Sequence, residues 1–378
     1  MNYFIFPDTD TTLYQASGSS NAGLDEILEI QKTMSNSGGN IKVSRILMKF
    51  DLGEISGSIV NGTITNPKFY LNLYDAGSEN LSTSQSLWAY PISQSWVEGQ
   101  GTFSDSPVTT DGASWQYRDD STQRTYWLAD GATNVSSSGG SWQTTVYASQ
   151  SFKYEDQDMR MNVTPIVNKW LDGTYPNNGF IIKRSGSFGN SDTNVDEGSQ
   201  DRLGNFKFFS RQTHTIYPPK LEVEWYDTKW STGSLSGLSS SELEDMSVYM
   251  KGLRTKYKEN SKVKFRLIGR AKYPTKSYSN TASEYLTAKY LPSGSVENIG
   301  GDGSYYSVLD AQTEDVIVPF GTGSLISCDS TGNYFNLWMN GLQAERYYKF
   351  QFRVVSGSNT TEETIQHFDD DFTFKVVR

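Results

Sequence analysis

Apolar and polar residues alternate with a period of two along most of the chain. In the segment 220–225, the apolar residues Leu221, Val223 and Trp225 fall on one face. The same alternation recurs in the segments 46–50, 69–73, 263–267, 348–354 and 372–376. Strands of this kind bury one face and expose the other, whereas buried parallel strands read as continuous apolar runs. The pattern predicts an all-β protein built of antiparallel sandwiches.

Helix signals are few. The segment 164–173 has Thr164 as a candidate N-cap, Pro165 at the first helical position and Gly173 just past the end. A capping-box pattern at 241–244 is much shorter. We therefore expect one short helix in the N-terminal domain.

The chain length requires more than one core. Single cores stop growing near roughly 250–300 residues, and this chain has 378. The stretch 230–241 is rich in Gly and Ser, a composition typical of linkers. The sequence predicts a first sandwich over 1–229, a linker over 230–241 and a second sandwich over 242–378.

A long polar segment, 100–158, interrupts the first domain and is dense in aromatic residues. Loops beyond about 15 residues are usually functional or disordered, and aromatic residues are rare in disordered segments. We expect an ordered insertion. Core packing, a protein interface and a glycan platform are open roles for its rings. The candidate contact residues are Trp115, Tyr117, Tyr126, Trp127, Trp142 and Tyr147.

Composition limits the kinds of partner. The net charge of −10 and the pI of about 4.9 disfavour nucleic acid, whose phosphates need a basic surface. The single cysteine, Cys328, excludes an intramolecular disulfide and a Cys-based zinc site, and is expected to be a small buried hydrophobe. The segment 1–8 carries no signal-peptide pattern, and no stretch reads as a membrane helix. We expect synthesis in a host cytoplasm and no membrane insertion.

Catalytic patterns are weak, so no catalytic residue is predicted. The two histidines, His214 and His367, fall in different predicted domains and lack a nucleophile elbow. Carboxylate pairs such as Asp8 with Asp10, or Glu98 with Asp105, are expected by chance among 43 acidic residues.

Cofactor patterns are equally weak. Asp8-x-Asp10 and the run 192–201 leave a structural calcium ion open, although neither has EF-hand spacing. Solvated loops are the favoured interpretation of both, and no cofactor is predicted. The run 369–371, three aspartates, is expected to be a hairpin turn.

Five motifs in the first domain occur in the order found in the DNRLRE family of β-sandwich domains, and the domain resembles that family. They are the strand 45–52, the Ser-Trp-x-Glu-Gly turn at 95–99, the helix 163–171, the strand 178–183 and the closing segment 210–224. The resemblance implies a jelly-roll-like sandwich related to carbohydrate-binding modules. The chain departs from the family in two ways. Its insertion at 100–158 is longer than the usual connection, and it carries no signal-peptide pattern although the family is mostly secreted.

The second domain resembles an immunoglobulin or fibronectin type III sandwich near its end. The segment 341–350 looks like a tyrosine-corner region. The segment 273–298 would then be an atypical insertion.

Tandem Ser/Gly- and aromatic-rich sandwiches without a signal peptide resemble virion structural proteins of tailed bacteriophages. This resemblance implies a non-catalytic component of the tail, baseplate or neck, located in the virion. Its partners would be other virion proteins in a symmetric oligomeric assembly. The alternative is a carbohydrate-binding module that attaches the particle to a host surface glycan, and a less favoured one is a polysaccharide-degrading enzyme.

Overall fold

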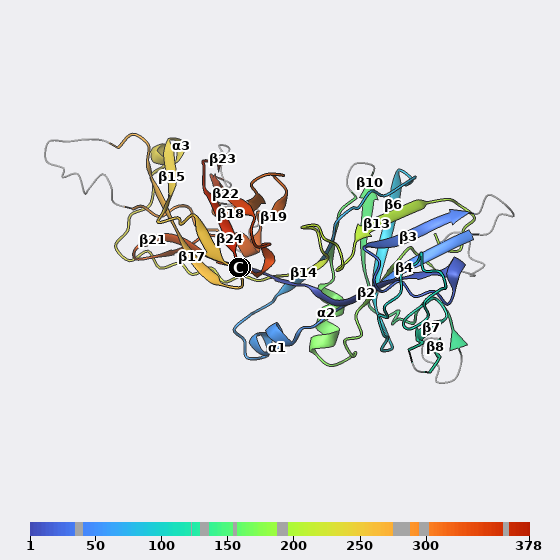
Figure 1. Cartoon of the computed structure of the whole chain (residues 1–378). Helices are drawn as coiled ribbons and strands as arrows, with labels where there is room; N and C mark the ends of the chain where they lie inside the picture. Colours follow the sequence, from blue (N-terminus) through green and yellow to red (C-terminus); the bar gives the residue numbers. More distant parts are fainter. Residues whose placement is uncertain are drawn as a thin grey trace, which may run out of the picture. The chain divides into compact units, whose positions relative to one another are not determined.

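The computed structural model describes residues 1–34, 41–121, 123–128, 136–153, 157–186, 196–274, 288–294, 302–357 and 363–378. The chain divides into two compact units. The N-terminal unit comprises Ile5–Ser58 and Lys68–Val223. The C-terminal unit comprises Met1–Phe4, Ile59–Pro67 and Glu224–Arg378. Antiparallel, curled sheets dominate, and the predicted all-β sandwich fold is confirmed (Figure 1).

Two sheets form the framework of the N-terminal unit. Its elements are β2 (Pro7–Tyr14), β3 (Ile27–Met34), β4 (Ile41–Phe50), α1 (Gly53–Val60), β5 (Lys68–Leu73), β6 (Ser84–Pro91), β7 (Tyr117–Asp119), β8 (Thr125–Leu128), β9 (Ser136–Ser137), β10 (Ala148–Lys153), β11 (Met159–Asn162), α2 (Thr164–Leu171), β12 (Phe180–Lys183), β13 (Gly204–Phe209) and β14 (Lys220–Glu224). The larger sheet has seven strands in the order β10-β6-β12-β4-β3-β13, with β2 paired to β4. The smaller sheet contains β14, β5 and β11 in that order. A third, three-stranded sheet has the order β7-β8-β9.

The large sheet curls so that its two outermost strands approach each other. Phe152 of β10 and Phe206 of β13 have ring centroids 4.9 Å apart, and both side chains are buried. Since β10 and β13 stand at opposite ends of the strand order, this contact brings the two ends of the sheet together.

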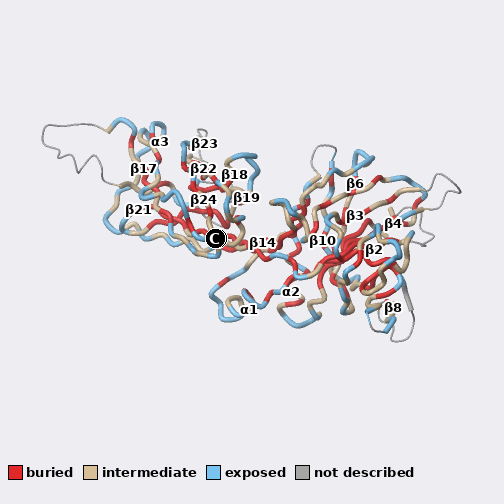
Figure 2. The backbone as a smooth tube through the Cα atoms, in the orientation of Figure 1, coloured by how far each residue is buried: buried red, intermediate tan, exposed pale blue. Residues whose placement is uncertain are grey.

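The central strand β4 is buried on both faces. Ile46 and Met48 lie on one face and Val43 and Leu47 on the other, and all four are at most 1% exposed. We call the second face, which also carries Leu13 of β2, the outer face of the sheet. An ordinary two-layer sandwich would expose this face, so another segment must cover it. Figure 2 shows the buried stretches around β2 and β4 in red.

The predicted helix forms as α2, with one local correction. Ile166, Val167 and Trp170 are its buried residues. The N-cap is Val163 instead of Thr164, because the Thr164 hydroxyl accepts a hydrogen bond from Phe69 N (2.9 Å). The helix α1 was not expected, since Gly53 and Gly57 lower its intrinsic helix propensity.

The C-terminal unit contains two further sheets. Its elements are β1 (Asn2–Ile5), α3 (Ser240–Glu244), β15 (Met246–Lys251), β16 (Lys256–Lys258), β17 (Lys262–Ala271), β18 (Gly303–Asp310), β19 (Val316–Val318), β20 (Ser327–Asp329), β21 (Gly332–Trp338), β22 (Tyr347–Ser356), β23 (Thr364–Phe368) and β24 (Thr373–Val377). One sheet has the order β15-β17-β21-β20. The other has the order β16-β24-β22-β18-β19, with β23 paired to β22.

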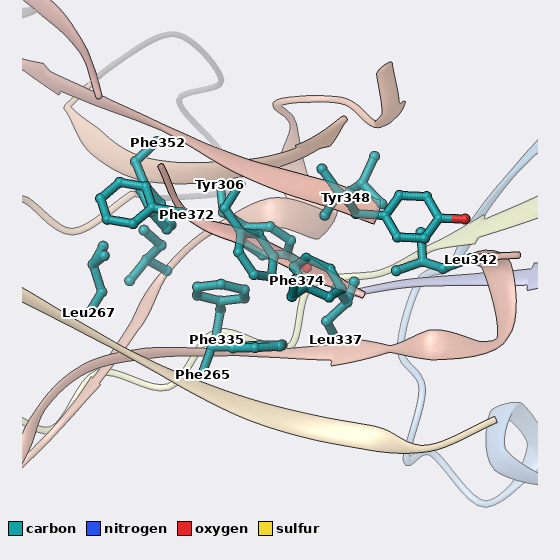
Figure 3. Packing of buried hydrophobic residues seen from close by; sticks show 14 of the residues in the cluster. Phe265, Leu267, Tyr306, Phe335, Leu337, Leu342, Tyr348, Phe352, Phe372 and Phe374 are labelled. Atoms are coloured by element: carbon teal, nitrogen blue, oxygen red, sulfur yellow. The ribbon is translucent and has the colours of Figure 1, made fainter. Parts of the chain in front are cut away.

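Aromatic rings fill the core of the C-terminal unit. Phe265, Phe335, Phe350 and Phe374 are buried and pack at ring-centroid distances of 4.7–6.0 Å. Figure 3 labels Phe265, Phe335 and Phe374. Rings packed edge to face or offset add a favourable quadrupole interaction to their burial. Inward-facing positions of both sheets supply these rings, as the period-two pattern predicts.

The tyrosine-corner pattern has its hydrogen bond. The Tyr348 hydroxyl donates to the Gln343 carbonyl, 2.9 Å away, and the Tyr348 side chain is 2% exposed. Such a bond fastens the connection before β22 to the strand itself.

The three aspartates at 369–371 were expected to form a hairpin turn, and this prediction is wrong. Both β23 and β24 pair with β22, and the register shifts between Phe352↔Phe368 and Lys349↔Thr373. The segment 364–377 is therefore one interrupted partner of β22, and the aspartates form its bulge. Exposed charges suit a bulge because its backbone leaves the ladder and faces solvent.

The Gly/Ser-rich stretch 230–241 carries backbone hydrogen bonds within the C-terminal unit. Ser231 N donates to the Cys328 carbonyl (3.0 Å), and Tyr290 N donates to the Ser236 carbonyl (3.1 Å). The capping box of α3 uses Ser239 and Glu242 instead of the expected positions 241 and 244, with Ser239 N 2.8 Å from Glu242 Oε2.

Candidate binding surface

The aromatic insertion covers the outer face of the large sheet. Trp115 and Trp127 belong to a buried cluster that also contains Leu13, Leu47 and Ile181 of the sheet. Trp127 is 0% exposed, and its indole Nε1 donates to the Ser114 carbonyl (2.9 Å). The insertion is therefore ordered in its described part, and these two tryptophans act as core residues with no ring face available to a ligand.

Tyr117 and Tyr126 lie, with Trp127, in the three-stranded sheet β7-β8-β9 of the insertion. Tyr117 is 6% exposed and packs against Tyr126, with ring centroids 4.8 Å apart. The Arg124 guanidinium lies 5.6 Å from the Tyr117 ring. Tyr126 is 46% exposed, so it is the member of this pair that a partner can reach.

The remaining two predicted residues join an aromatic surface on β6. Trp88, Tyr90, Trp142 and Tyr147 form what we call the aromatic patch. Neighbouring ring centroids are 4.8 Å apart for Trp88 and Tyr147, 6.0 Å for Tyr90 and Tyr147, and 6.2 Å for Tyr90 and Trp142. Tyr147 is 49% exposed, and the other three rings are half-buried.

Strand alternation and pairing bring these four rings together. On β6, Leu87 and Ala89 are buried, and the intervening Trp88 and Tyr90 occupy the outer face. The pairing Ala148↔Ala89 places Tyr147 beside them. Sequence reasoning missed Trp88 and Tyr90, although the alternation of segment 84–91 was the signal that could have found them.

A buried ion pair supports the patch from beneath. The Arg45 guanidinium contacts both carboxylate oxygens of Glu197, at 3.1 and 2.5 Å. It also lies 4.7 Å from the Trp115 ring and 5.0 Å from the Trp142 ring. Cation–π attraction of this kind strengthens where the cation is desolvated, so Arg45 fixes the position of Trp142.

Lys183 completes this support. Its Nζ lies 3.6 Å from Glu197 Oε2 and 5.0 Å from the Trp142 ring. Burial lowers the pKa of Lys183 to about 8, although the Glu197 carboxylate acts in the opposite direction. A single buried carboxylate thus holds two cations on the outer face.

Hydroxyl groups border the aromatic patch. Ser86 and Ser151 hydroxyls are 3.0 Å apart across β6 and β10, and Ser149 lies opposite Trp88. The surface therefore offers ring faces and neutral hydrogen-bonding groups, which suit binding by stacking and polar contact.

The structure brings together one carboxylate pair, though not in a way that favours catalysis. Asp10 N donates to Glu98 Oε1 (2.9 Å), and Arg211 binds both Glu98 oxygens at 2.8 and 3.1 Å. Asp10 is 0% exposed, and burial raises the pKa of its carboxyl to about 7. Arg211 pairs with the Glu98 carboxylate, and the buried Asp10 carboxyl is out of reach of a substrate. Both residues therefore have structural roles.

The other candidate groups lie apart. Asp105 accepts hydrogen bonds from Thr109 and Thr102, which lower the pKa of its carboxyl to about 2. His214 is 90% exposed, with Nε2 3.8 Å from Glu26. Cys328 is buried, and burial raises the pKa of its thiol to about 11.

The run 192–201, for which a structural calcium ion was left open, is described only from Asp196 onward. Asp192 lies outside the described residues. Among the residues that the structure does describe, no group of three or more His, Cys, Asp or Glu side chains is placed to hold a metal ion.

Neither sequence nor structure comparison relates the chain to a known protein. No protein-family model matches it, and neither curated proteins nor solved structures give a significant match. In the described part of the chain, no helix is both long and apolar enough to cross a membrane.

Proposed function

We propose that this protein is a non-catalytic structural component of a bacteriophage virion that assembles through protein–protein contacts, with the aromatic patch as one contact surface. The observation that carries the proposal is the gathering of Trp88, Tyr90, Trp142 and Tyr147 on one face. Tyr and Trp are enriched in protein interfaces and dominate their binding energy. The phage assignment comes from the sequence resemblance and adds the tail, baseplate or neck as the location.

The two cations that lie against Trp142 support a role in assembly. Trp142 lies within 5.0 Å of both Arg45 and Lys183, which Glu197 holds in place. Preorganised rings lose little conformational entropy on binding, so more of the contact energy appears as affinity. A subunit contact that repeats many times in a particle gains affinity at each copy from this preorganisation.

Electron microscopy of native particles that contain the protein tests the proposal. We expect the aromatic patch at a subunit contact, and the double variant Trp88→Ala with Tyr147→Ala should lower incorporation into particles. Tyr126→Ala is the control, because the Tyr126 side chain is 46% exposed, close to the 49% of Tyr147, and lies outside the patch. A protein that occurs only free and monomeric in infected cells would contradict the proposal.

Carbohydrate binding is the second candidate function, and the patch chemistry favours it specifically. Trp88 and Tyr90 have ring planes only 13° apart and centroids 6.4 Å apart, with Ser149 opposite Trp88. Aromatic faces beside hydroxyls fit the apolar faces and hydroxyl groups of a sugar. The family resemblance of the first domain points to the same ligand class.

A glycan array followed by titration of individual oligosaccharides at millimolar concentration tests this candidate. Binding should be lost in Trp88→Ala and retained in Tyr126→Ala. Absence of any hit at concentrations that reveal millimolar dissociation constants would count against it.

A further inference from the structure

A strongly basic segment lies within this acidic protein. Between Lys251 and Lys272 there are nine Lys and Arg residues and a single acidic residue, Glu259. The N-terminal unit as a whole carries 24 Asp and Glu residues against 16 Lys and Arg residues, and the C-terminal unit 19 against 17. The positive charge is thus concentrated in one part of the C-terminal unit.

Strand pairing arranges part of this charge in a row. Lys262, Lys264 and Arg266 alternate on β17 with Val263, Phe265 and Leu267, which pack in or against the core. The three cations therefore point away from the core, roughly 7 Å apart along the strand. The neighbouring strand β21 places Trp338 opposite Lys262 and Tyr334 opposite Arg266. We call these five residues the basic face.

The aromatic rings hold the cations in place. Lys264 Nζ lies 3.6 Å from the Tyr334 ring centroid, Arg266 lies 5.2 Å from the same ring, and Lys262 lies 5.4 Å from the Trp338 ring. Lys262 and Lys264 are exposed. Cationic side chains that are already held over aromatic rings lose less conformational entropy when they bind a partner.

One carboxylate lies at the basic face. Asp329 binds Lys264 Nζ at 2.9 Å and Arg266 at 2.5 Å. The Arg266 guanidinium and the Lys264 ammonium hold the pKa of Asp329 well below its usual range. Three cations against one carboxylate leave the basic face positive.

The N-terminal unit contains a hollow of the opposite charge, which we call the acidic groove. It has a volume of about 250 Å³ and is lined by Asp25, Glu26, Glu29, Tyr14 and Phe103. The Tyr14 and Phe103 rings lie 4.1 Å apart. Glu26 is exposed, and Asp25 and Glu29 are half-buried.

The acidic groove carries negative charge that favours a cation. Burial, followed by the nearby Glu29 and Asp105 carboxylates, raises the pKa of Asp25 to about 6. Carboxylates in such surroundings are stabilised by a positive group that enters from outside. A Lys or Arg side chain can place its charge between the carboxylates and its stem along the Phe103 ring.

We propose that the basic face of one copy of this chain docks against the acidic groove of a second copy. The inference rests on the proposed assembly function and names one of its contacts. The two surfaces differ, so the contact is heterologous. Repetition of such a contact builds a ring or a filament, which are the forms a repeating virion component takes.

The composition of the basic face favours a protein partner over an extended polyanion. Asp329 stands among the cations and would repel phosphate or uronate groups that follow the row. A protein surface of mixed charge has no such conflict. Trp, Tyr and Arg together are also the residues enriched in protein interfaces.

Sedimentation velocity of the full chain tests the proposal. At about 0.05 M salt the wild-type chain should associate increasingly over roughly 1–100 µM, and at about 0.5 M salt it should dissociate, because screening weakens the contact. Replacing Lys262 and Lys264 by Gln removes charge from the face. Replacing Asp25 by Asn and Glu26 by Gln removes charge from the groove. Each double variant should associate roughly tenfold more weakly or worse.

Mixing the two variants makes the test specific. Each retains the surface that the other has lost, so an equimolar mixture should form a 1:1 dimer that grows no further. The control is Lys256→Gln with Lys258→Gln, the same charge change on the exposed positions of β16, which should associate as the wild type does.

Three results would overturn the proposal. These are a wild-type chain that stays monomeric throughout, face and groove variants that associate as well as the wild type, or a monomer that binds heparin or single-stranded DNA through Lys262 and Lys264. None of them affects the microscopy of native particles, so this contact can fail while the proposed function stands.

Discussion

Arg45 and Glu197, 152 residues apart in sequence, form an ion pair in which both side chains are at most 2% exposed. Two charges removed from water are stable only when each satisfies the other, so this pair joins the segment before β13 to the central strand of the sheet. It also positions Trp142 of the aromatic patch. The interior of the N-terminal unit and its candidate binding surface therefore depend on the same carboxylate.

Glu197→Gln should destabilise the N-terminal unit by about 3–5 kcal/mol, because it leaves Arg45 and Lys183 buried without a carboxylate. Urea unfolding followed by tryptophan fluorescence measures this. Glu79→Gln is the control: Glu79 pairs with Lys207 and its side chain is 60% exposed, so a change within about 1 kcal/mol is expected. A loss as small for Glu197→Gln would show that the ion pair contributes little.

Asp10 makes stability depend on pH. Burial raises the pKa of its carboxyl from 3.8 to about 7 in the folded chain. Between these values the folded state holds a proton that the unfolded state has released, so the free energy of unfolding from this group falls as pH rises. The loss is up to about 4 kcal/mol at pH 8.

Asp10→Asn should remove that fall and make the chain more stable than the wild type at pH 8. The asparagine keeps an oxygen to accept the hydrogen bond from Arg211 N, which is 2.7 Å from Asp10 Oδ2. Urea unfolding at several pH values from 4 to 8 gives the slope. Asp8→Asn, at an exposed position, is the control. If the variant and the wild type lose stability in parallel, Asp10 is not the titrating group.

Trp127→Ala should cost about 3–5 kcal/mol, because a fully buried ring leaves a large cavity under the insertion. Tyr126→Ala, one residue earlier and 46% exposed, should cost less than about 1 kcal/mol. Limited proteolysis adds a second readout, since loss of Trp127 should expose the segment 100–128 to cleavage. Equal effects of the two substitutions would refute the core role of Trp127.

Tyr348→Phe removes the hydrogen bond to the Gln343 carbonyl and keeps the ring in the core. The expected loss is about 1–2 kcal/mol, because the carbonyl loses its donor. Tyr347→Phe changes the adjacent residue, which is 59% exposed, and should be nearly neutral. Thermal unfolding of the two variants compares them directly, and an unchanged midpoint for Tyr348→Phe would contradict the tyrosine-corner role.

The fold was predictable because alternation is a local property. Leu221 and Val223, or Phe350 and Phe352, reveal their strands without knowledge of any partner. The aromatic patch was half predictable. Trp142 and Tyr147 belong to the long polar segment 100–158, whose density of aromatic residues is visible in the sequence. Trp88 and Tyr90 belong to a strand whose outer face cannot be recognised until the pairing is known.

The support beneath the patch could not be predicted. Glu197 follows a polar stretch that reads as a solvated loop, and only the folded chain brings it to Arg45 and Lys183. The bulge at 369–371 was missed for a related reason. Three aspartates suit a hairpin turn and a bulge equally well, and only the register of β23 and β24 on β22 distinguishes them.

The contact between Phe152 and Phe206 has a consequence for crowded conditions. Sheets with open edges offer rows of backbone donors and acceptors that foreign strands can join, which leads to aggregation. In the N-terminal unit the strands at the two ends of the large sheet turn toward each other, with these rings 4.9 Å apart. Such an arrangement shields the unit against strand exchange at high local concentration and leaves side-chain surfaces as its means of association.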